Sequence, residues 1–373
     1  MKTFFHLIEE IQKPGLCQQC GGCVTFCTAI NYGALELDED GKPRYKDIEK
    51  CVECGLCYSI CPETHELDEE IKWLFSWQAP MGRVLDATVA RAMDVPVRKQ
   101  GTDGGVVTAL LLHLFEKGQI DGAIVTKKIG SFQRVPWLAS SREEIMEAAG
   151  FHFDTSHGLE LFSERYSTYS AFSPSLLEVG RMGTKRLNQV AFVGTPCQVN
   201  TIRRIQALGI DPSHSIKIVF GLFCTGNFIF NHEHRLRIEK MGGFQWNEVT
   251  KINVKEHLLI HLHNGQVRSI PLDQLDFMKR HACRYCSDYT SEFADLSFGG
   301  LGSPEDWTTV VARTPLGQSV LNKALGRAIE AFPHKEAPDI GAAALAKAMQ
   351  WSEKKKQSVA NNRSRKQYQP VMA

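Results

Sequence analysis

The 373-residue sequence predicts an α+β domain at the N-terminus followed by a mixed α/β domain. Two observations support this fold class. A four-cysteine pattern occurs twice before residue 66, and after residue 80 short apolar strands alternate with helices that begin beside glycine or proline. The predicted boundaries are 1–66 for the first domain, 67–80 for a linker, 81–340 for the α/β domain and 341–373 for a C-terminal helix with a basic tail.

The composition carries no strong charge or membrane signal. The 43 basic and 42 acidic residues give a formal net charge of +1, which does not mark a nucleic-acid-binding protein. Residues 1–15 lack the features of a signal peptide, and the apolar run Val106–Phe115 is about half the roughly 20 residues that span a bilayer. We therefore expect a cytoplasmic protein, free or peripheral on a membrane complex, whose twelve cysteines are reduced and bind metal.

Eight cysteines form two copies of the pattern C-x2-C-x2-C-x3-C. Three cysteines at successive spacings of two fit three corners of an iron–sulfur cube, whereas zinc sites usually use two separated C-x2-C pairs. In two-cluster ferredoxins the fourth cysteine of each copy ligates the other cluster. The predicted ligand sets are therefore crossed: Cys17, Cys20, Cys23 and Cys61 for one [4Fe–4S] cluster, and Cys51, Cys54, Cys57 and Cys27 for the second.

Between the two copies, short apolar segments flank the turn Asp40-Gly41-Lys42-Pro43 and predict a small hairpin. With the doubled motif, this segment resembles a bacterial-type two-cluster ferredoxin domain over about residues 10–66. Thr28 stands where the second copy has Pro62, which loosens the turn without removing a ligand. The alternative of zinc or incidental cysteines is disfavoured because the motif is repeated.

The segment Arg98–Lys128 reads as loop, helix, turn and strand, with the helix beginning near Val106 and Gly118 as its stop. A glycine-rich entry to a helix lets backbone N–H groups approach a phosphate, and the helix dipole favours negative charge there. A plain turn before a buried helix is the alternative, because the segment has neither a dinucleotide fingerprint nor a Walker A motif. The candidate contacts are Gly101, Thr102, Asp103, Gly104, Gly105 and Thr108.

The other four cysteines lie near predicted strand ends or in a C-x2-C pair. Cys197 follows the strand VAFVG, at the start of a helix entered through Thr-Pro, and Cys224 ends the strand IKIVFGLFC. Taken singly, either one is a small buried side chain. Taken alone, the pair Cys283 and Cys286 fits the pattern of a redox disulfide or of half a zinc site. Together they supply the four ligands that a third [4Fe–4S] cluster needs.

The chain also resembles a known family, the coenzyme F420 hydrogenase/dehydrogenase beta subunits, over roughly residues 80–330. Four ordered blocks carry the resemblance: TDGGVVTALL, VAFVGTPCQV, GLFC and CRYCSDYTSEFADLSFGGLGSPEDWTTVVART. It implies a mixed α/β FAD-binding domain of the F420-reducing beta-subunit type, with a [4Fe–4S] cluster close to the flavin. The implied contacts are Gly101 to Gly105 and Thr108 with FAD, Gly194, Thr195 and Pro196 beside the flavin, and Cys197, Cys224, Cys283 and Cys286 as cluster ligands.

The resemblance implies an oxidoreductase subunit that exchanges hydride with coenzyme F420 through FAD and passes single electrons along three [4Fe–4S] clusters. The expected recipients are other subunits of a formate dehydrogenase, hydrogenase, heterodisulfide reductase or membrane-bound dehydrogenase. One alternative keeps the flavin and uses NAD(P)H, ferredoxin or a pigment instead, as in the similar hydroxymethyl chlorophyll reductases. Another is a flavin-free electron-transfer adaptor. No side chain is expected to act as a catalytic acid, base or nucleophile.

Basic pairs are candidates for binding the phosphodiester and oligoglutamate tail of coenzyme F420, with solvated faces as the alternative. They are Lys127, Lys128, Arg203, Arg204, Lys279 and Arg280. The histidines at 257, 261 and 263 alternate around an Asn-Gly turn, which predicts a hairpin and not a metal site. Residues 341–357 are predicted to be helical, and the basic remainder either stays disordered or docks on an acidic partner subunit.

Overall fold

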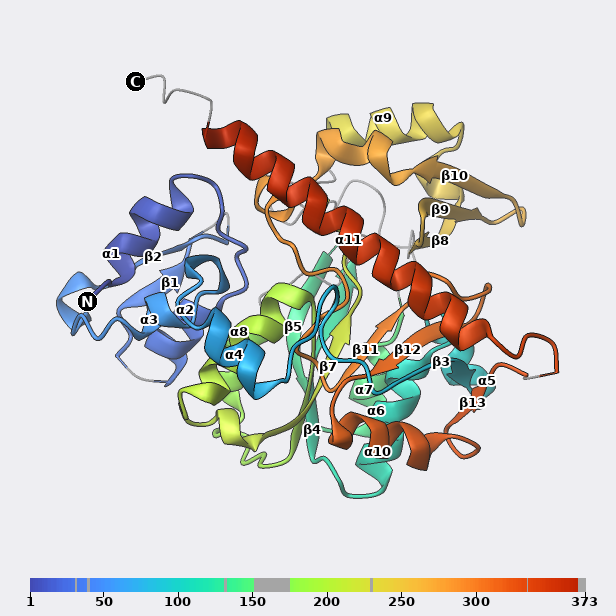
Figure 1. Ribbon diagram of the computed structural model, residues 1–373, viewed down its shortest axis with the longest axis horizontal. Helices are drawn as coiled ribbons and strands as arrows, with labels where there is room; N and C mark the ends of the chain where they lie inside the picture. The colour runs from blue at the N-terminus through green and yellow to red at the C-terminus, as the bar shows by residue number, and fades with distance from the viewer. Residues whose placement is uncertain are drawn as a thin grey trace.

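The computed structural model describes the chain apart from residues 31, 39–40, 131–132, 151–174, 229–230, 334 and 368–373. A ferredoxin-like domain at the N-terminus lies against a larger mixed α/β domain, in the predicted order. A long C-terminal helix, α11 (Ile340–Gln367), runs diagonally from the α/β domain toward the ferredoxin-like domain (Figure 1). The two domains share one continuous hydrophobic core.

The ferredoxin-like domain consists of short helical turns and one hairpin. Its elements are α1 (Phe4–Leu7), α2 (Gly22–Val24), β1 (Leu35–Leu37), β2 (Pro43–Tyr45) and α3 (Leu56–Ser59). The antiparallel pairing of β1 with β2 confirms the predicted hairpin, although Asp40 of its turn lies outside the described residues. Phe4, Leu7 and Ile60 are buried and bring these turns together.

Residues 67–80, predicted as a linker, contain the helix α4 (Asp68–Leu74). Acidic residues fill its first turn, where the helix dipole favours negative charge. Ile71 is fully buried in the shared core, and Asp68 forms an ion pair with Arg204 of the α/β domain. This segment is therefore part of the contact between the domains, because its buried face has a partner on each side.

The α/β domain is built on an eight-stranded sheet of order β13-β3-β12-β11-β7-β6-β4-β5. The neighbours β4, β6, β7 and β11 are parallel, and the pairs toward both edges are antiparallel. The segments GAIVT and VAFVG, predicted as strands, lie in β4 and β6. The strands are β3 (Asp86–Ala92), β4 (Gly122–Gly130), β5 (Gln133–Ala139), β6 (Val190–Gly194), β7 (Ile216–Leu222), β11 (Leu296–Gly299), β12 (Thr308–Ala312) and β13 (Ile329–Ala331).

Helices cover both faces of this sheet because successive side chains of a strand point to opposite faces. Along β6, Phe192 packs on the face shared with α8 and the ferredoxin-like domain, whereas Val193 packs on the other face with α6 and α10. The predicted starts of α6 and α8 are confirmed. The helices are α5 (Val95–Gln100), α6 (Val106–Glu116), α7 (Arg142–Glu147), α8 (Pro196–Ala207) and α10 (Pro315–Ala324).

A smaller three-stranded antiparallel sheet with its own core stands beside the large one, packed with α9 (His232–Gly242). Its strands are β8 (Val249–Val254), β9 (His257–Leu262) and β10 (Val267–Pro271). The pairing of β9 with β10 confirms the hairpin predicted around Asn264 and Gly265. His257 uses its Nδ1 atom in a hydrogen bond with Ser269 Oγ across this hairpin, at 2.7 Å.

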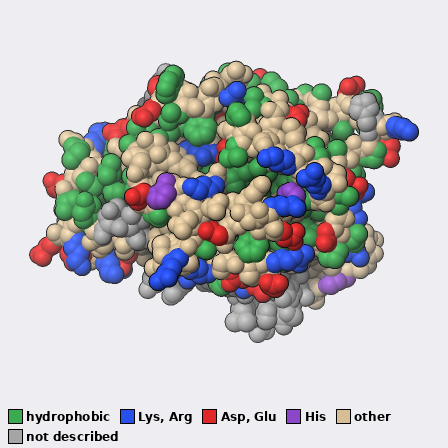
Figure 2. All heavy atoms as spheres, turned by 90° about the horizontal axis from the view of Figure 1, so that it is seen from below, with side chains coloured by type: hydrophobic (Ala, Val, Ile, Leu, Met, Phe, Trp, Pro, Cys, Tyr) green, Lys and Arg blue, Asp and Glu red, His purple; other side chains and the backbone are tan. Residues whose placement is uncertain are grey.

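The helix α11 continues well beyond residue 357, where its predicted helical part ended. Ala344 in its first half is buried against Val89 and Trp307 of the α/β domain. Within the described ranges, no helix has both the length and the apolarity that crossing a membrane requires. On the face seen in Figure 2, basic and acidic side chains are interspersed, as the net charge of +1 suggests.

Candidate functional site

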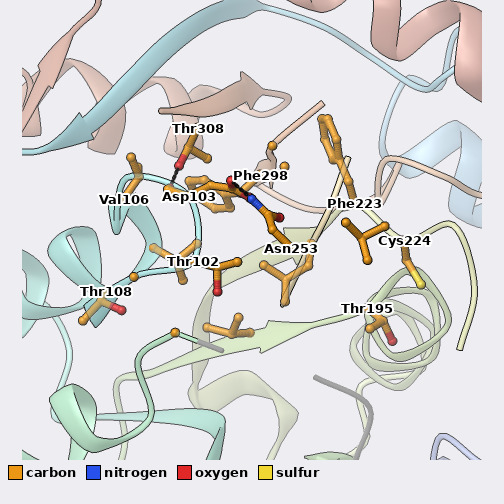
Figure 3. A pocket seen from close by; sticks show the side chains of 18 of the residues that line it. Thr102, Asp103, Val106, Thr108, Thr195, Phe223, Cys224, Asn253, Phe298 and Thr308 are labelled. Carbon is orange, nitrogen blue, oxygen red and sulfur yellow. Dashed lines mark hydrogen bonds between the residues drawn. The ribbon is translucent and has the colours of Figure 1, made fainter. Parts of the chain in front are cut away.

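A cavity of about 280 Å³ opens at the carboxyl ends of the parallel strands β6, β7 and β11. Open α/β sheets usually bind ligands at this edge. Its walls are largely apolar, with hydroxyl and amide groups at a few points, as small-molecule sites usually are. In Figure 3, Thr102 and Thr108 lie on one side of the cavity, and Phe223, Cys224 and Thr195 lie on the other.

The glycine-rich loop before α6 forms one wall of the cavity. A Cβ atom on Gly101 would lie closer than 3.0 Å to the backbone of Gly105, so the loop folds this tightly only with glycine there. Gly104 has φ +65°, and a Cβ on it would lie 2.7 Å from Asp306 O. The loop therefore places the N-terminus of α6 at the cavity.

Asp103 of this loop lines the cavity and faces the segment of the small sheet that contains Asn253. Its side chain is 14% exposed, and burial raises the pKa of the carboxyl group although Lys255 opposes the shift. Asn253 Nδ2 of β8 donates to Asp103 Oδ1 at 2.6 Å, and Lys255 Nζ lies 3.8 Å from the same oxygen. The sequence analysis missed Asn253 and Lys255, because no local motif marks residues that reach a loop 150 positions away.

Most predicted flavin contacts line the cavity. The residues that do so are Gly101, Thr102, Asp103, Gly105, Thr108 and Thr195. Gly104 packs behind the loop, Gly194 ends β6 against Phe192 and Gln198, and Pro196 faces a second cavity beside Cys197. Lys127 contacts Glu147 and lies 4.5 Å from the centre of the Trp137 ring.

The first cysteine set surrounds a small cavity of about 30 Å³ inside the ferredoxin-like domain. Burial raises the pKa of the Cys23 thiol well above its usual value, and Cys20, Cys17 and Cys61 add to the shift because their charges are close. Burial likewise raises the pKa of Cys17 to about 11. The structure thus places Cys61, from the second motif, with three cysteines of the first.

The second cysteine set likewise contains one cysteine from the other motif. Burial raises the pKa of Cys57 to about 12, and the nearby Cys54, Cys27 and Cys51 contribute further. Cys27, from the first motif, therefore lies among the cysteines of the second. Val52, between two cysteines of this set, is 57% exposed, so the set lies near the surface of the domain.

The third set gathers cysteines from three distant segments. Burial raises the pKa of Cys197 well above its usual value, and the proximity of Cys286 and Cys224 raises it further. Burial also raises the pKa of Cys286 to about 12, with Cys283 among the causes. The backbone N–H of Asn227 donates to Cys283 Sγ at 3.3 Å. The sequence alone could not show that Cys197 and Cys224 meet the C-x2-C pair.

The three sets follow one another through the molecule. Cys57 contributes to the raised pKa of Cys23, and Cys20 has the largest charge effect on the raised pKa of Cys197. Between the last two stands Thr201 of α8, whose Oγ1 lies 3.4 Å from Cys20 Sγ and donates to Cys197 O at 2.8 Å. Cys224, at the far end of the third set, lines the large cavity.

Each set brings four cysteines together. Among the described residues, no group of three or more Cys, His, Asp or Glu side chains is arranged as ligands around one metal ion. In an iron–sulfur cube, by contrast, each cysteine sulfur binds a different corner. The N–H and hydroxyl groups that point at Cys17, Cys20 and Cys283 are the outer partners that such sulfurs commonly have.

Of the six basic candidates for coenzyme F420, the five whose side chains the structure describes do not line the large cavity. Arg203 pairs with Asp295 at 2.8 Å and Arg204 with Asp68, so both serve the fold. Arg280 contacts Gln19 of the ferredoxin-like domain, and Lys279 lies near Cys283 and Cys224. The side chain of Lys128 lies outside the described residues.

Two family models cover most of the α/β domain. Residues 187–336 match the model for the C-terminal part of the coenzyme F420 hydrogenase/dehydrogenase beta subunit, and residues 87–163 match the model for its N-terminal part. Residues 9–62 match a 4Fe-4S dicluster domain.

Two curated relatives have names that include coenzyme F420. The beta subunit of coenzyme F420 hydrogenase from Methanococcus voltae is 30% identical over 247 residues, covering 65% of this chain and 82% of that protein. The coenzyme F420-dependent sulfite reductase of Methanocaldococcus jannaschii is 28% identical over 333 residues, covering 84% of this chain. The matched part spans only 47% of the sulfite reductase.

A solved structure has a similar fold. A chain of the F420-reducing [NiFe] hydrogenase complex from Methanosarcina barkeri aligns with a TM-score of 0.64 at 28% sequence identity. The alignment covers 77% of this chain and 94% of that chain.

Proposed function

This chain belongs to the coenzyme F420 hydrogenase/dehydrogenase beta-subunit family, and on that premise we propose that it is an iron–sulfur flavoprotein subunit that transfers electrons between coenzyme F420 and a partner oxidoreductase. The relatives' names make the family one of oxidoreductases. FAD, three [4Fe–4S] clusters and coenzyme F420 are the cofactors and substrate of the proposal.

One observation carries this proposal: Cys224 belongs to the third cysteine set and also lines the large cavity. A redox group in the cavity would therefore lie directly beside a cluster at Cys197, Cys224, Cys283 and Cys286. From there the first and second sets continue toward the surface of the ferredoxin-like domain. The chain thus offers a path with one terminus in a cavity and the other near solvent.

The residues around the cavity fit FAD by their chemistry. The N-terminus of α6 offers backbone N–H groups and a favourable dipole to a phosphate, and Thr102, Thr108 and Thr195 offer hydroxyl groups. Apolar walls such as Phe298 and Val106 exclude water from a ring system. Bound FAD would supply the exchange between a hydride carrier and one-electron clusters.

The cysteine sets fit three iron–sulfur clusters, with the crossed assignment predicted from the two motifs. Iron binds thiolate and releases the thiol proton, so the high pKa values of the cysteines without metal do not oppose ligation once iron is present. Thr195 Oγ1 lies 3.3 Å from Cys197 Sγ, which gives that sulfur a hydrogen-bond partner on the cavity side. Hydrogen bonds of this kind stabilise a thiolate.

Lys251 and Lys255 join the six basic candidates from the sequence as cations that would face coenzyme F420. Lys251 lies on β8 and Lys255 in the turn after it, on either side of the cavity-lining residues 252–254. Their side chains are only 15% and 16% exposed, and both act on the charge of Asp103. A partly buried ammonium group binds phosphate or carboxylate more strongly than an exposed one, because water screens it less. The phosphodiester and oligoglutamate groups of coenzyme F420 have the matching charge.

The second cysteine set would be the exit toward a partner subunit. Val52 and Ile48 beside this set are 57% and 64% exposed, and exposed apolar residues favour a protein contact. Relatives are named as subunits of F420 hydrogenase and of an F(420)H(2) dehydrogenase, which are multi-subunit enzymes by their names. We extend this association to the chain and place the partner at this end.

The test uses anaerobically purified full-length protein supplied with FAD and mixed with reduced coenzyme F420, NADH or NADPH while absorbance is recorded. We expect about twelve iron atoms per chain, four for each cube, and rapid bleaching of flavin and clusters by reduced F420. Bleaching only by a nicotinamide or reduced ferredoxin would refute the F420 assignment, and failure to retain FAD would favour a flavin-free adaptor.

Two ligand variants test the order of the path. In Cys283→Ala, reduced F420 should bleach the flavin and leave the clusters of the ferredoxin-like domain oxidised, because the third set is interrupted. In Cys57→Ala, flavin and the two inner clusters should still bleach, since only the outermost set is lost. Equal behaviour of the two variants would contradict the proposed order.

A further inference from the structure

The helix α11 lies outside the residues that the family models match, which end at residue 336. At its start, a Cβ on Gly341 would lie 2.7 Å from Ala87 O, so the helix is seated tightly on β3. Near its other end, Arg363 Nη2 lies 3.2 Å from His65 Nε2 of the ferredoxin-like domain, and Asn362 donates to Arg284 O at 2.9 Å. The helix is held at both ends (Figure 1), and between them it contacts the third cysteine set.

Lys355, in the second half of α11, points its ammonium group at that set. Its Nζ donates to Cys224 O at 2.8 Å and to Asp288 O at 2.7 Å, and it lies 4.0 Å from Cys286 Sγ. These acceptors belong to two separate segments, one after β7 and one after the C-x2-C pair. A single ammonium group therefore joins the two segments that supply three of the four cysteines.

The contacts of Lys355 suit an ammonium group. Two backbone carbonyl oxygens, those of Cys224 and Asp288, accept hydrogen bonds from its Nζ, and an ammonium group has three donors to offer. A second cation lies near the same set: Lys279 packs its side chain against Gly226, where a Cβ would lie 2.7 Å from Lys279 Cε. Lys355 is the cation in direct contact with the set, because its Nζ lies 4.0 Å from Cys286 Sγ.

We propose that Lys355 is a positioning residue that raises the reduction potential of a [4Fe–4S] cluster held by Cys197, Cys224, Cys283 and Cys286. The inference rests on the proposed function, because it requires the third cluster. Four thiolates and an oxidised cube carry a net negative charge, and one added electron makes that charge more negative. A fixed cation 4.0 Å from a ligating sulfur stabilises the reduced form more than the oxidised form, without any bond forming or breaking.

This role gives α11 a function in electron transfer. A higher potential at the third cluster holds electrons beside the cavity, and a lower one releases them toward the ferredoxin-like domain. The position of Lys355 depends on α11 being seated on β3 and on the ferredoxin-like domain together. The helix therefore couples the docking of the two domains to the distribution of electrons between them.

The test compares Lys355→Met with Lys354→Met, a matched control that removes the same charge one residue away on the same helix. Lys354 is exposed, and its Nζ stays 5.8 Å from the centre of the Trp351 ring. Each reconstituted full-length protein is titrated anaerobically with dithionite, which supplies one electron per cluster, and the reduced clusters are followed by electron paramagnetic resonance. The third-cluster signal is identified as the one missing from Cys283→Ala.

We expect Lys355→Met to lower the equilibrium constant for reduction of the third cluster at least tenfold. For a one-electron couple, this lowers the midpoint potential by about 59 mV. The other two clusters, and all three in Lys354→Met, should keep their midpoints. Lys355→Arg keeps the charge and should restore most of the shift. A Lys355→Met midpoint equal to that of Lys354→Met would overturn the proposal.

Iron content separates this proposal from the function on which it rests. Wild-type protein with about eight iron atoms, two cubes rather than three, would overturn the third cluster and the role of Lys355 together. If Lys355→Met alone fails to assemble that cluster, Lys355→Arg decides the question. An assembled cluster with a near wild-type midpoint in Lys355→Arg supports the proposal, and a missing one refutes it, because charge would then be insufficient.

Discussion

Gly22 of the ferredoxin-like domain packs against Thr201 of α8, and this contact gives the sharpest stability prediction. A Cβ on Gly22 would lie closer than 3.0 Å to Thr201 Cγ2, whereas its next neighbours, Thr201 Cβ and Leu176 Cδ1, are at 3.6 and 3.7 Å. Gly22 has no positive φ, so alanine suits its backbone and only the packing is perturbed. The change Gly22→Ala therefore adds one methyl group, which overlaps with one existing methyl group, Thr201 Cγ2.

Overpacking a core contact of this kind costs about 1–3 kcal/mol. With an unfolding entropy of about 2.1 cal/mol/K per residue over 373 residues, this lowers the thermal midpoint by about 1–4 °C. Thr201→Ser removes the opposing Cγ2 atom and keeps the hydroxyl group that bonds Cys197 O. The double variant should therefore recover most of the loss caused by Gly22→Ala.

The assay is the apparent thermal midpoint of the protein with its clusters, recorded anaerobically at one scan rate for all four proteins of the double-mutant cycle. Gly183→Ala is the matched control, because a Cβ there meets no atom within 4 Å, and it should leave the midpoint unchanged. Equal losses in Gly22→Ala with and without Thr201→Ser would refute the reasoning, since the two side chains would then not be in contact.

Three further predictions concern an ion pair, a buried acid and the release of iron. Arg204→Met should destabilise the protein by about 2–3 kcal/mol, measured by chemical denaturation, because Asp68 loses its partner between the domains; an unchanged midpoint would contradict this. Burial raises the pKa of Asp103, so the stability of its protonated form is lost as pH rises through the raised value. Asp103→Asn does not ionise and should gain stability relative to the wild type as pH rises from the ordinary pKa of aspartate, about 3.9, through the raised value, and a constant difference in thermal midpoint would rule this out. An iron chelator should remove about a third of the iron, one cube of three, in a fast phase, because the set that includes Cys51 and Cys54 lies beside exposed residues; a single phase would argue against this order.

Local sequence signals predicted the elements whose determinants lie within a few residues. The hairpin β1–β2, the strand β6 and the start of α8 have their turn, apolar and capping residues side by side in the chain. Thr195, for example, caps α8 together with Gln198 only three residues later. Such elements can be located without tertiary contacts, because the hydrogen bonds that define their ends join residues only a few positions apart.

The features that sequence patterns did not locate depend on contacts over long separations. The helix α4 was predicted as linker because the partners of Ile71 and Asp68 lie in the other domain. From the sequence, Arg203 and Arg204 were candidates for binding coenzyme F420, with a solvated face as the alternative. Both are buried, where Asp295 and Asp68 neutralise them. Lys355 reaches Cys224 across 131 positions, which no local pattern records.

The helix α8 fixes the distances between the cavity, the third cysteine set and the first cysteine set, which are the first steps of the proposed electron path. Thr195 at its N-cap lines the cavity, Cys197 on its first turn belongs to the third set, and Thr201 touches the first set. Cys197 and Thr201 are four residues apart, so they share one face of a rigid element. The spacing between the large cavity and the first cysteine set therefore follows from helix geometry and not from loop conformation. In the proposed electron path, a change in potential such as that proposed for Lys355 would therefore direct electrons without altering this spacing.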